Sequence, residues 1–254
     1  MFMSYPGYLT DNFEPFNPLE VSKEGEKIFC RGNSRKYTEF YCTGVYRGIS
    51  TGYTVGCNLR CVFCWVEWSR DYPKEYGEYF TPEEVAESLI ENAKIKKVSK
   101  VRISGGEPTI SKEHLFGVLR KLKNTNLLFI LETNGILFGD DEKYVKELGD
   151  CENIHVRVSL KAGSPEGFQR RTGAKGEFYQ LPFIAISNLM KNRISFHIAC
   201  MSDPRLMPKD ERGSIIKKLD SIGYSDFFEE EICDPYKTTV MRLEKAGYRK
   251  LFKY

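Results

Sequence analysis

The chain of 254 residues is informative first for what it lacks. It contains no apolar run of about eighteen residues, the length that a membrane-spanning helix needs, so no membrane span is expected. Residues 1–10 have neither a basic head nor an apolar core, and so do not resemble a signal peptide. No internal repeat is present, and the net charge of +3 neither requires nor excludes a nucleic-acid partner. These absences predict a cytoplasmic globular protein.

Cysteine, by contrast, is well represented, with eight residues. In a chain that is not exported, these should be reduced thiols or metal ligands rather than disulfides. Three of them follow the pattern Cys-x3-Cys-x2-Cys, at Cys57, Cys61 and Cys64. Three thiolates can hold an iron–sulfur cluster and leave one iron free for another ligand. The spacing also suits a structural zinc site, for which Cys30 or Cys42 could supply the fourth ligand, so the residues alone leave both open.

From residue 47 onward, the expected strands alternate with expected helices. Strands are predicted at 47–55, 100–104, 127–131, 154–160, 194–200 and 225–232. Helices are predicted from Thr81 and at 111–123, 141–148, 165–171, 180–191, 209–222 and 236–246. Such alternation indicates βαβ units and a parallel sheet, whose ligands gather at the C-terminal ends of the strands.

The strand at 154–160 has two unlike faces. Its apolar residues alternate with His155, Arg157, Ser159 and the following Lys161. Because strand side chains alternate between faces, the apolar face should meet the helices and the polar face the interior. A closed barrel fills its interior with packed apolar side chains, so a polar interior favours an open one that holds a polar ligand. The prediction is an α/β fold, a partial, open (β/α)6 TIM-like barrel.

Three regions are predicted along the chain. Residues 1–46 form an irregular, aromatic-rich N-terminal extension, 47–233 form the barrel core, and 234–254 form a C-terminal helix and tail. The loop at 65–80 mixes aromatic and basic side chains, which can stack on nucleic acid, although such loops more often pack as lids.

Two motifs together resemble the radical S-adenosylmethionine (radical SAM) superfamily. Its signature is Cys-x3-Cys-x-aromatic-Cys, and Phe63, directly before the third cysteine, fills the aromatic place. About forty residues later, after an expected strand, Gly105-Gly106-Glu107-Pro108 matches the GGE motif of the same superfamily. Two glycines allow a backbone to approach a ligand closely, and a carboxylate can accept strong hydrogen bonds from an ammonium group.

The resemblance implies a set of cofactor ligands. Cys57, Cys61 and Cys64 would hold three irons of a [4Fe–4S] cluster, SAM would chelate the fourth iron, and Glu107 would secure the amino group of SAM. The segment Glu132-Thr133-Asn134-Gly135 is similar to the TNG stretch of many members. The resemblance implies cofactor-binding roles for Phe63, Gly105, Gly106, Glu107, Asn134, Ser159, Lys161 and His197.

The resemblance also suggests an activity. Ser159-Leu160-Lys161 and the later Thr172-Gly173 resemble the DLK…TG stretch of glycyl-radical-enzyme activating enzymes, with Ser159 in place of aspartate. Such an oxidoreductase takes an electron from a flavodoxin- or ferredoxin-type donor and cleaves SAM to methionine and a 5′-deoxyadenosyl radical. The radical then abstracts hydrogen from a substrate, here a partner protein. An RNA-modifying enzyme of the wybutosine type is the alternative, a small-molecule substrate is open, and a zinc-stabilised binding module is a remote third reading.

Overall fold

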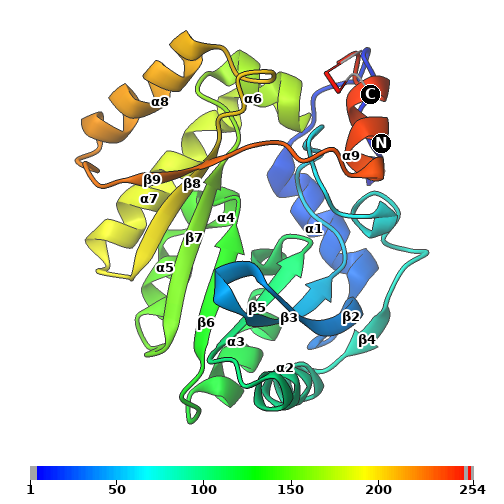
Figure 1. Cartoon of the computed structure of the whole chain (residues 1–254), viewed down its shortest axis with the longest axis vertical. Helices are drawn as coiled ribbons and strands as arrows, with labels where there is room; N and C mark the ends of the chain where they lie inside the picture. The colour runs from blue at the N-terminus through cyan, green and yellow to red at the C-terminus, as the bar shows by residue number, and fades with distance from the viewer. Residues whose placement is uncertain (1–4, 249–250, 253–254) are drawn as a thin grey trace.

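A computed structural model describes residues 5–248 and 251–252 of the chain. Its centre is a sheet of six parallel strands (Figure 1), in the order of the chain. They are β3 (Ile49–Thr54), β5 (Lys100–Gly105), β6 (Leu128–Thr133), β7 (Ile154–Leu160), β8 (Phe196–Met201) and β9 (Phe228–Glu231). Among the described residues β9 does not pair back to β3, so the barrel stays open. The predicted partial (β/α)6 fold is confirmed.

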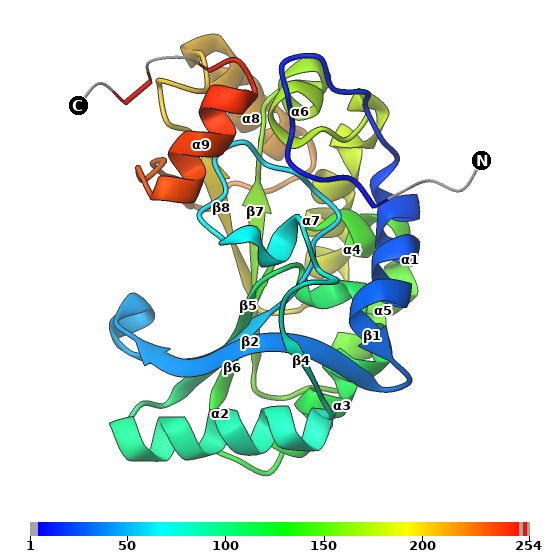
Figure 2. The same ribbon diagram turned by 90° about the vertical axis from the view of Figure 1, so that its right-hand side faces the viewer.

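Helices connect the parallel strands and cover one face of the sheet (Figures 1 and 2). They are α2 (Pro82–Lys96), α3 (Lys112–Leu122), α4 (Ile136–Asp140), α5 (Glu142–Leu148), α6 (Pro165–Thr172), α7 (Leu181–Lys191) and α8 (Lys209–Ser221). Single 3-10 turns lie at Val45–Arg47, Trp68–Arg70, Pro108–Ile110 and Gly176–Gln180. Helix α2 begins as predicted: the Thr81 hydroxyl accepts from the amide of Glu84, whose carboxylate accepts from the amide of Thr81.

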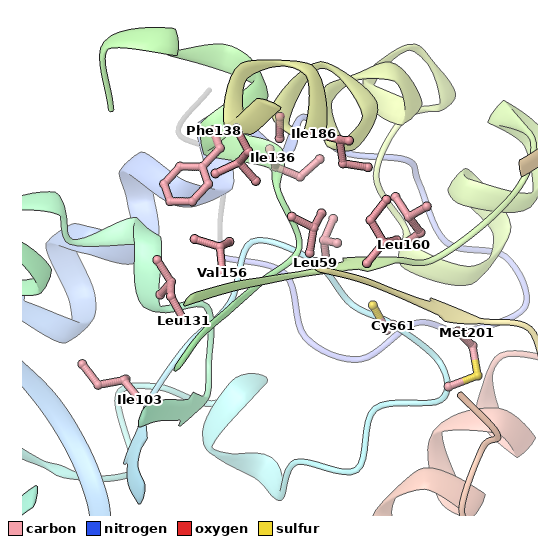
Figure 3. Packing of buried hydrophobic residues seen from close by; sticks show 14 of the residues in the cluster. Leu59, Cys61, Ile103, Leu131, Ile136, Phe138, Val156, Leu160, Ile186 and Met201 are labelled. Atoms are coloured by element: carbon pink, nitrogen blue, oxygen red, sulfur yellow. The ribbon is translucent and has the colours of Figure 1, made fainter. Parts of the chain in front are cut away.

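The hydrophobic core lies between this sheet and its helices. Figure 3 shows Val156 and Leu160 of β7 facing Ile136, Phe138 and Ile186 of α4 and α7, and all five are buried in one cluster. Burial of one face of the strand against helices leaves its alternate residues for the opposite face. The predicted division of β7 into an apolar outer face and a polar inner face is therefore confirmed.

The N-terminal region differs from its prediction. Within 5–46 the structure contains α1 (Pro18–Phe29), β1 (Cys30–Arg31) and β2 (Ser34–Thr43), and β2 pairs antiparallel with β3 and with the short β4 (Glu78–Phe80). The expectation of an irregular segment is wrong, because residues 18–43 form a helix and two strands. Asn17 accepts hydrogen bonds from the amides of Leu19 and Glu20 and so begins α1. Residues 1–4 of the predicted extension lie outside the described residues.

The C-terminal segment crosses the molecule. After β9 the chain runs over the open side to the far edge, where α9 (Lys237–Lys245) packs beside the loop that holds the cysteines (Figures 1 and 2). Thr239 donates from its hydroxyl to the carbonyl of Cys64 at 3.1 Å. Residues 249–250 and 253–254 of the predicted tail are outside the described residues. No helix of the described part has the length and apolar character needed to cross a membrane.

Candidate active site

The C-terminal ends of the parallel strands surround a cavity of about 170 Å³. It brings together ten of the eleven predicted site residues: Cys57, Cys61, Phe63, Cys64, Gly105, Gly106, Glu107, Asn134, Ser159 and Lys161. These residues come from four separate segments of the chain, which only the parallel strand order places side by side. A larger cavity of about 350 Å³ between α3 and the α5–β7 turn contains none of them.

The cysteine loop leaves β3 and is held by α6. The amides of Arg60 and Val62 donate to the carbonyls of Thr172 and Arg171, at 2.8 and 2.9 Å. Burial, together with the negative charges of nearby groups, raises the pKa of the Cys57 thiol to about 12. A thiolate at this position therefore requires a cationic centre beside it. Among residues 5–248 and 251–252, no three His, Cys, Asp or Glu side chains are already arranged around a single metal ion.

The glycine-rich loop after β5 lies against the start of the cysteine loop. The amides of Gly106 and Glu107 donate to the carbonyls of Thr54 and Gly56, at 2.8 and 2.9 Å. Gly105 adopts a φ of +90°, a backbone conformation that favours glycine. The close approach of this loop to the backbone of residues 54–56 therefore requires the two glycines.

Glu107 is buried at 3% exposure and ties two strand ends together. Its carboxylate accepts from the amide and hydroxyl of Thr109, from the hydroxyl of Thr133 at 2.8 Å and from the amide of Asn134 at 2.9 Å. Arg35 in turn donates to the carbonyl of Glu107 at 2.7 Å. Glu107 therefore fixes the shape of the loop in addition to lining the cavity.

We expect Gly106→Ala to be strongly destabilising. A Cβ at this position would lie 2.0 Å from the carbonyl oxygen of Gly56, a backbone atom that has little freedom to move. The loss in unfolding free energy should be about 3 kcal/mol or more, at the upper end for overpacked sites. Thermal unfolding measures it, with Gly44→Ala as the matched control, because a Cβ there meets nothing within 4 Å. Equal melting temperatures for the two variants would contradict the close approach.

The inner wall of the cavity is built from paired charges. On β7, Arg157 donates to Glu231 at 2.8 Å, Ser159 donates to the same carboxylate, and Lys161 donates to Ser159. Burial alone would raise the pKa of Glu231, but Lys161 and Arg157 hold it below its usual range. The predicted polar interior of the barrel therefore carries internal partners for its charges.

The opposite wall repeats this arrangement on β5 and β6. Glu132 accepts from Arg102 at 2.7 Å, from the Ser104 hydroxyl at 3.0 Å and from the Tyr46 hydroxyl at 2.7 Å. Each acidic side chain at the inner wall thus has a cation or hydroxyl as its donor.

Sequence reasoning missed Ser104, Met201 and Glu231 as cavity-lining residues, and it placed Glu132, Thr133 and Arg157 near the site without giving them a cofactor-binding role. Arg157 lies on the predicted polar face, so its period-two position was a usable signal, whereas nothing local marks Glu231. The structure does not bring His197 to this cavity. His197 lies four residues before Met201, the last residue of β8. Its ring is hydrogen-bonded to the ring of His155 at 2.7 Å.

Comparison with known proteins identifies the class. The model of the Radical SAM superfamily matches residues 52–212, which include the cysteine loop and the cavity walls as far as β8. The chain belongs to the radical SAM superfamily, a family of enzymes that use a [4Fe–4S] cluster and SAM.

Several curated relatives carry one name. A probable GTP 3′,8-cyclase of Methanococcus aeolicus is 34% identical over 127 residues, which are 49% of this chain and 40% of that protein. A probable GTP 3′,8-cyclase of Thermococcus kodakarensis is 33% identical over 123 residues, 48% of this chain and 38% of that protein. The match therefore spans about two fifths of the length of these relatives.

Solved structures share the fold. SuiB of Streptococcus suis bound to S-adenosylmethionine has a TM-score of 0.56 and 15% identity, over 72% of this chain and 40% of that one. TYW1 with a lysine–pyruvate adduct bound has a TM-score of 0.57 and 16% identity, over 81% of this chain and 74% of that one. At such identities the likeness shows the fold alone.

Proposed function

We propose that the chain binds a [4Fe–4S] cluster through Cys57, Cys61 and Cys64 and cleaves SAM reductively in the cavity that these residues line. One observation carries the proposal: the three thiols and the loop of Glu107 face a common cavity at the strand ends. When bound, the cluster supplies one electron to the sulfonium of SAM, which yields methionine and a 5′-deoxyadenosyl radical.

The residues present fit such a cluster. Three cysteines line the cavity among the described residues, so a four-iron cluster held there keeps one iron without a protein thiolate. The zinc alternative needs a fourth ligand from elsewhere. Cys42 does not line the cavity but donates its Sγ–H to the carbonyl of Asn92 on α2, and Cys30 packs with Phe29 and Ile110. The arrangement favours the cluster.

The polar wall supplies groups suited to SAM. The ammonium group of Lys161 has three N–H donors, and one of them donates to the hydroxyl of Ser159. The remaining donors are available for a carboxylate or a ribose hydroxyl. Asn134 donates to Asn58 at 2.7 Å, so its amide braces the cysteine loop at the same time. These residues orient the bound molecule, while the chemistry belongs to the cofactors.

For the substrate, we propose a partner protein from which hydrogen is abstracted, as in the activating enzymes that the 159–173 stretch resembles. In the structure the carbonyl of Thr172 accepts a hydrogen bond from the amide of Arg60, so this stretch also supports the cysteine loop. A nucleotide such as GTP is a second candidate, because the curated relatives are named probable GTP 3′,8-cyclases. The electron donor is proposed to be of the flavodoxin or ferredoxin type.

Anaerobic reconstitution tests the function directly. Iron and sulfide content, absorption spectra and 5′-deoxyadenosine release are measured before and after dithionite and SAM are added. We expect about four irons per chain and release of 5′-deoxyadenosine. A colourless protein that holds zinc and leaves SAM intact would overturn the proposal. If GTP is consumed in the same assay, the nucleotide replaces the partner protein as the proposed substrate.

A further inference from the structure

We propose that Arg60, Arg70 and Arg242 are positioning residues for the cysteine loop, each holding the main chain at one cluster-binding cysteine. The proposal rests on the function proposed above, because it takes Cys57, Cys61 and Cys64 as the ligands of the cluster. Arg60 occupies an unspecified position of the cysteine motif, Arg70 and Arg242 lie outside both motifs, and Arg242 lies beyond the stretch matched by the family model.

The contacts form a regular series. Arg60 donates to the carbonyl of Cys57 at 2.7 Å, Arg70 to that of Cys61 at 2.7 Å, and Arg242 to that of Cys64 at 2.9 Å. All three guanidinium groups are almost completely buried, at 0–2% exposure. A loop that bends around a cluster cannot pair its carbonyls within a helix or sheet, and buried carbonyls require partners. Here one arginine serves each cysteine.

The guanidinium groups also tie the loop to distant segments. Arg60 reaches the carbonyl of Pro6 near the N-terminus. Arg242 on α9 donates further to the carbonyls of Val66 and Glu67, so one side chain holds three carbonyls of the loop. Lysine, with a compact ammonium group, cannot reproduce this planar fork.

One carboxylate organises two of the arginines. Asp71, fully buried, pairs with Arg70 at 2.5 Å and with Arg242 at 2.6 Å. The three guanidinium groups carry three positive charges and Asp71 carries one negative charge, so a net positive charge lies behind the loop. Charge and hydrogen bonding near an iron–sulfur cluster set its reduction potential, and positive charge favours the reduced, more negative state. The arginines should therefore raise the potential of the cluster as well as shape its loop.

Arg242 gives the sharpest test, since it lies on α9 and is 178 residues from Cys64 in the sequence. The variants are Arg242→Lys and Arg242→Gln. Lys237→Gln is the control, because it removes one exposed positive charge from the same helix without touching the loop. Hydrogen exchange of residues 57–71 is measured on the cluster-free chain, and iron retention and midpoint potential are measured after anaerobic reconstitution.

Both variants should raise exchange in the loop by about tenfold or more, since the carbonyls of Val66 and Glu67 lose the donor that Arg242 supplies, and the carbonyl of Cys64 keeps only the Thr239 hydroxyl. Both should lose iron faster, and Arg242→Gln should also lower the midpoint potential, while the control matches the wild type. If Arg242→Gln fails to fold, Arg242→Lys carries the test. Unchanged exchange, or raised exchange with unchanged iron retention, would overturn the arginine proposal. A wild-type chain that takes up no iron would instead overturn the function on which it rests.

Discussion

Replacement of Cys61 by serine is expected to abolish iron loading and to reduce release of 5′-deoxyadenosine by more than about a hundredfold. Loss of an outer-shell partner of a metal site already costs about 10–100-fold, and loss of a ligand should cost more. Cys61 is buried at 9% exposure on the cavity wall, so no neighbouring thiol can take its place without a rearrangement of the loop. Iron analysis and product quantification after anaerobic reconstitution measure both effects.

Cys42→Ser is the matched control for this experiment. The Cys42 thiol donates to a helix carbonyl away from the cavity, so its loss should leave the iron content unchanged. The zinc alternative makes the opposite prediction, since it requires Cys42 or Cys30 as the fourth ligand. Four irons retained in Cys61→Ser, or metal lost in Cys42→Ser, would contradict the assignment.

Asp71→Asn is expected to lower the unfolding free energy of the cluster-free chain by about 3–5 kcal/mol, the usual cost of removing one member of a buried ion pair. Asp71 lies between Arg70 and Arg242, and its loss leaves two buried guanidinium groups without their carboxylate. Chemical denaturation measures the change. Asp226→Asn, on an exposed loop, should stay within about 0.5 kcal/mol of the wild type.

The same ion pair predicts a pH dependence. Burial would raise the pKa of Asp71, but Arg70 and Arg242 outweigh it and hold the pKa below its usual range. A carboxyl with a lowered folded-state pKa contributes stability above its unfolded pKa of about 3.9, and this contribution is lost as pH falls through the folded-state pKa. The stability difference between wild type and Asp71→Asn should therefore be constant near neutral pH and shrink below about pH 4. A difference that shrinks between pH 5 and 7 would argue against this pairing.

The sequence was sufficient for the parallel core because each strand and helix carries its own local signal. The alternation at 154–160 and the Thr81 cap are complete within a few residues, and both appear as predicted. The N-terminal region failed for the opposite reason. Its sheet pairing joins Tyr41 to Thr51, partners whose register no local pattern specifies.

The candidate site shows the same difference between local and long-range signals. The cysteines and Glu107 are recognisable because they lie in short motifs. Arg242 is not, because its partner Cys64 is 178 residues away. The resemblance implied a cofactor-binding role for His197, but the position on the strand does not decide what a side chain reaches. Its parallel partner Arg157 lines the cavity, whereas the ring of His197 is hydrogen-bonded to that of His155.

The acidic sequence of β9 has a consequence for how the protein behaves at high concentration. β9 is the terminal strand of the open sheet, and Phe227 and Ile232 beside it are 84% and 68% exposed. An edge strand flanked by apolar side chains is a template for pairing with other chains, and charge on the edge discourages it. Glu229 and Glu230, whose side chains are 49% and 44% exposed, provide that charge. The protein should therefore self-associate through this edge more readily when Glu229 and Glu230 are replaced by glutamine.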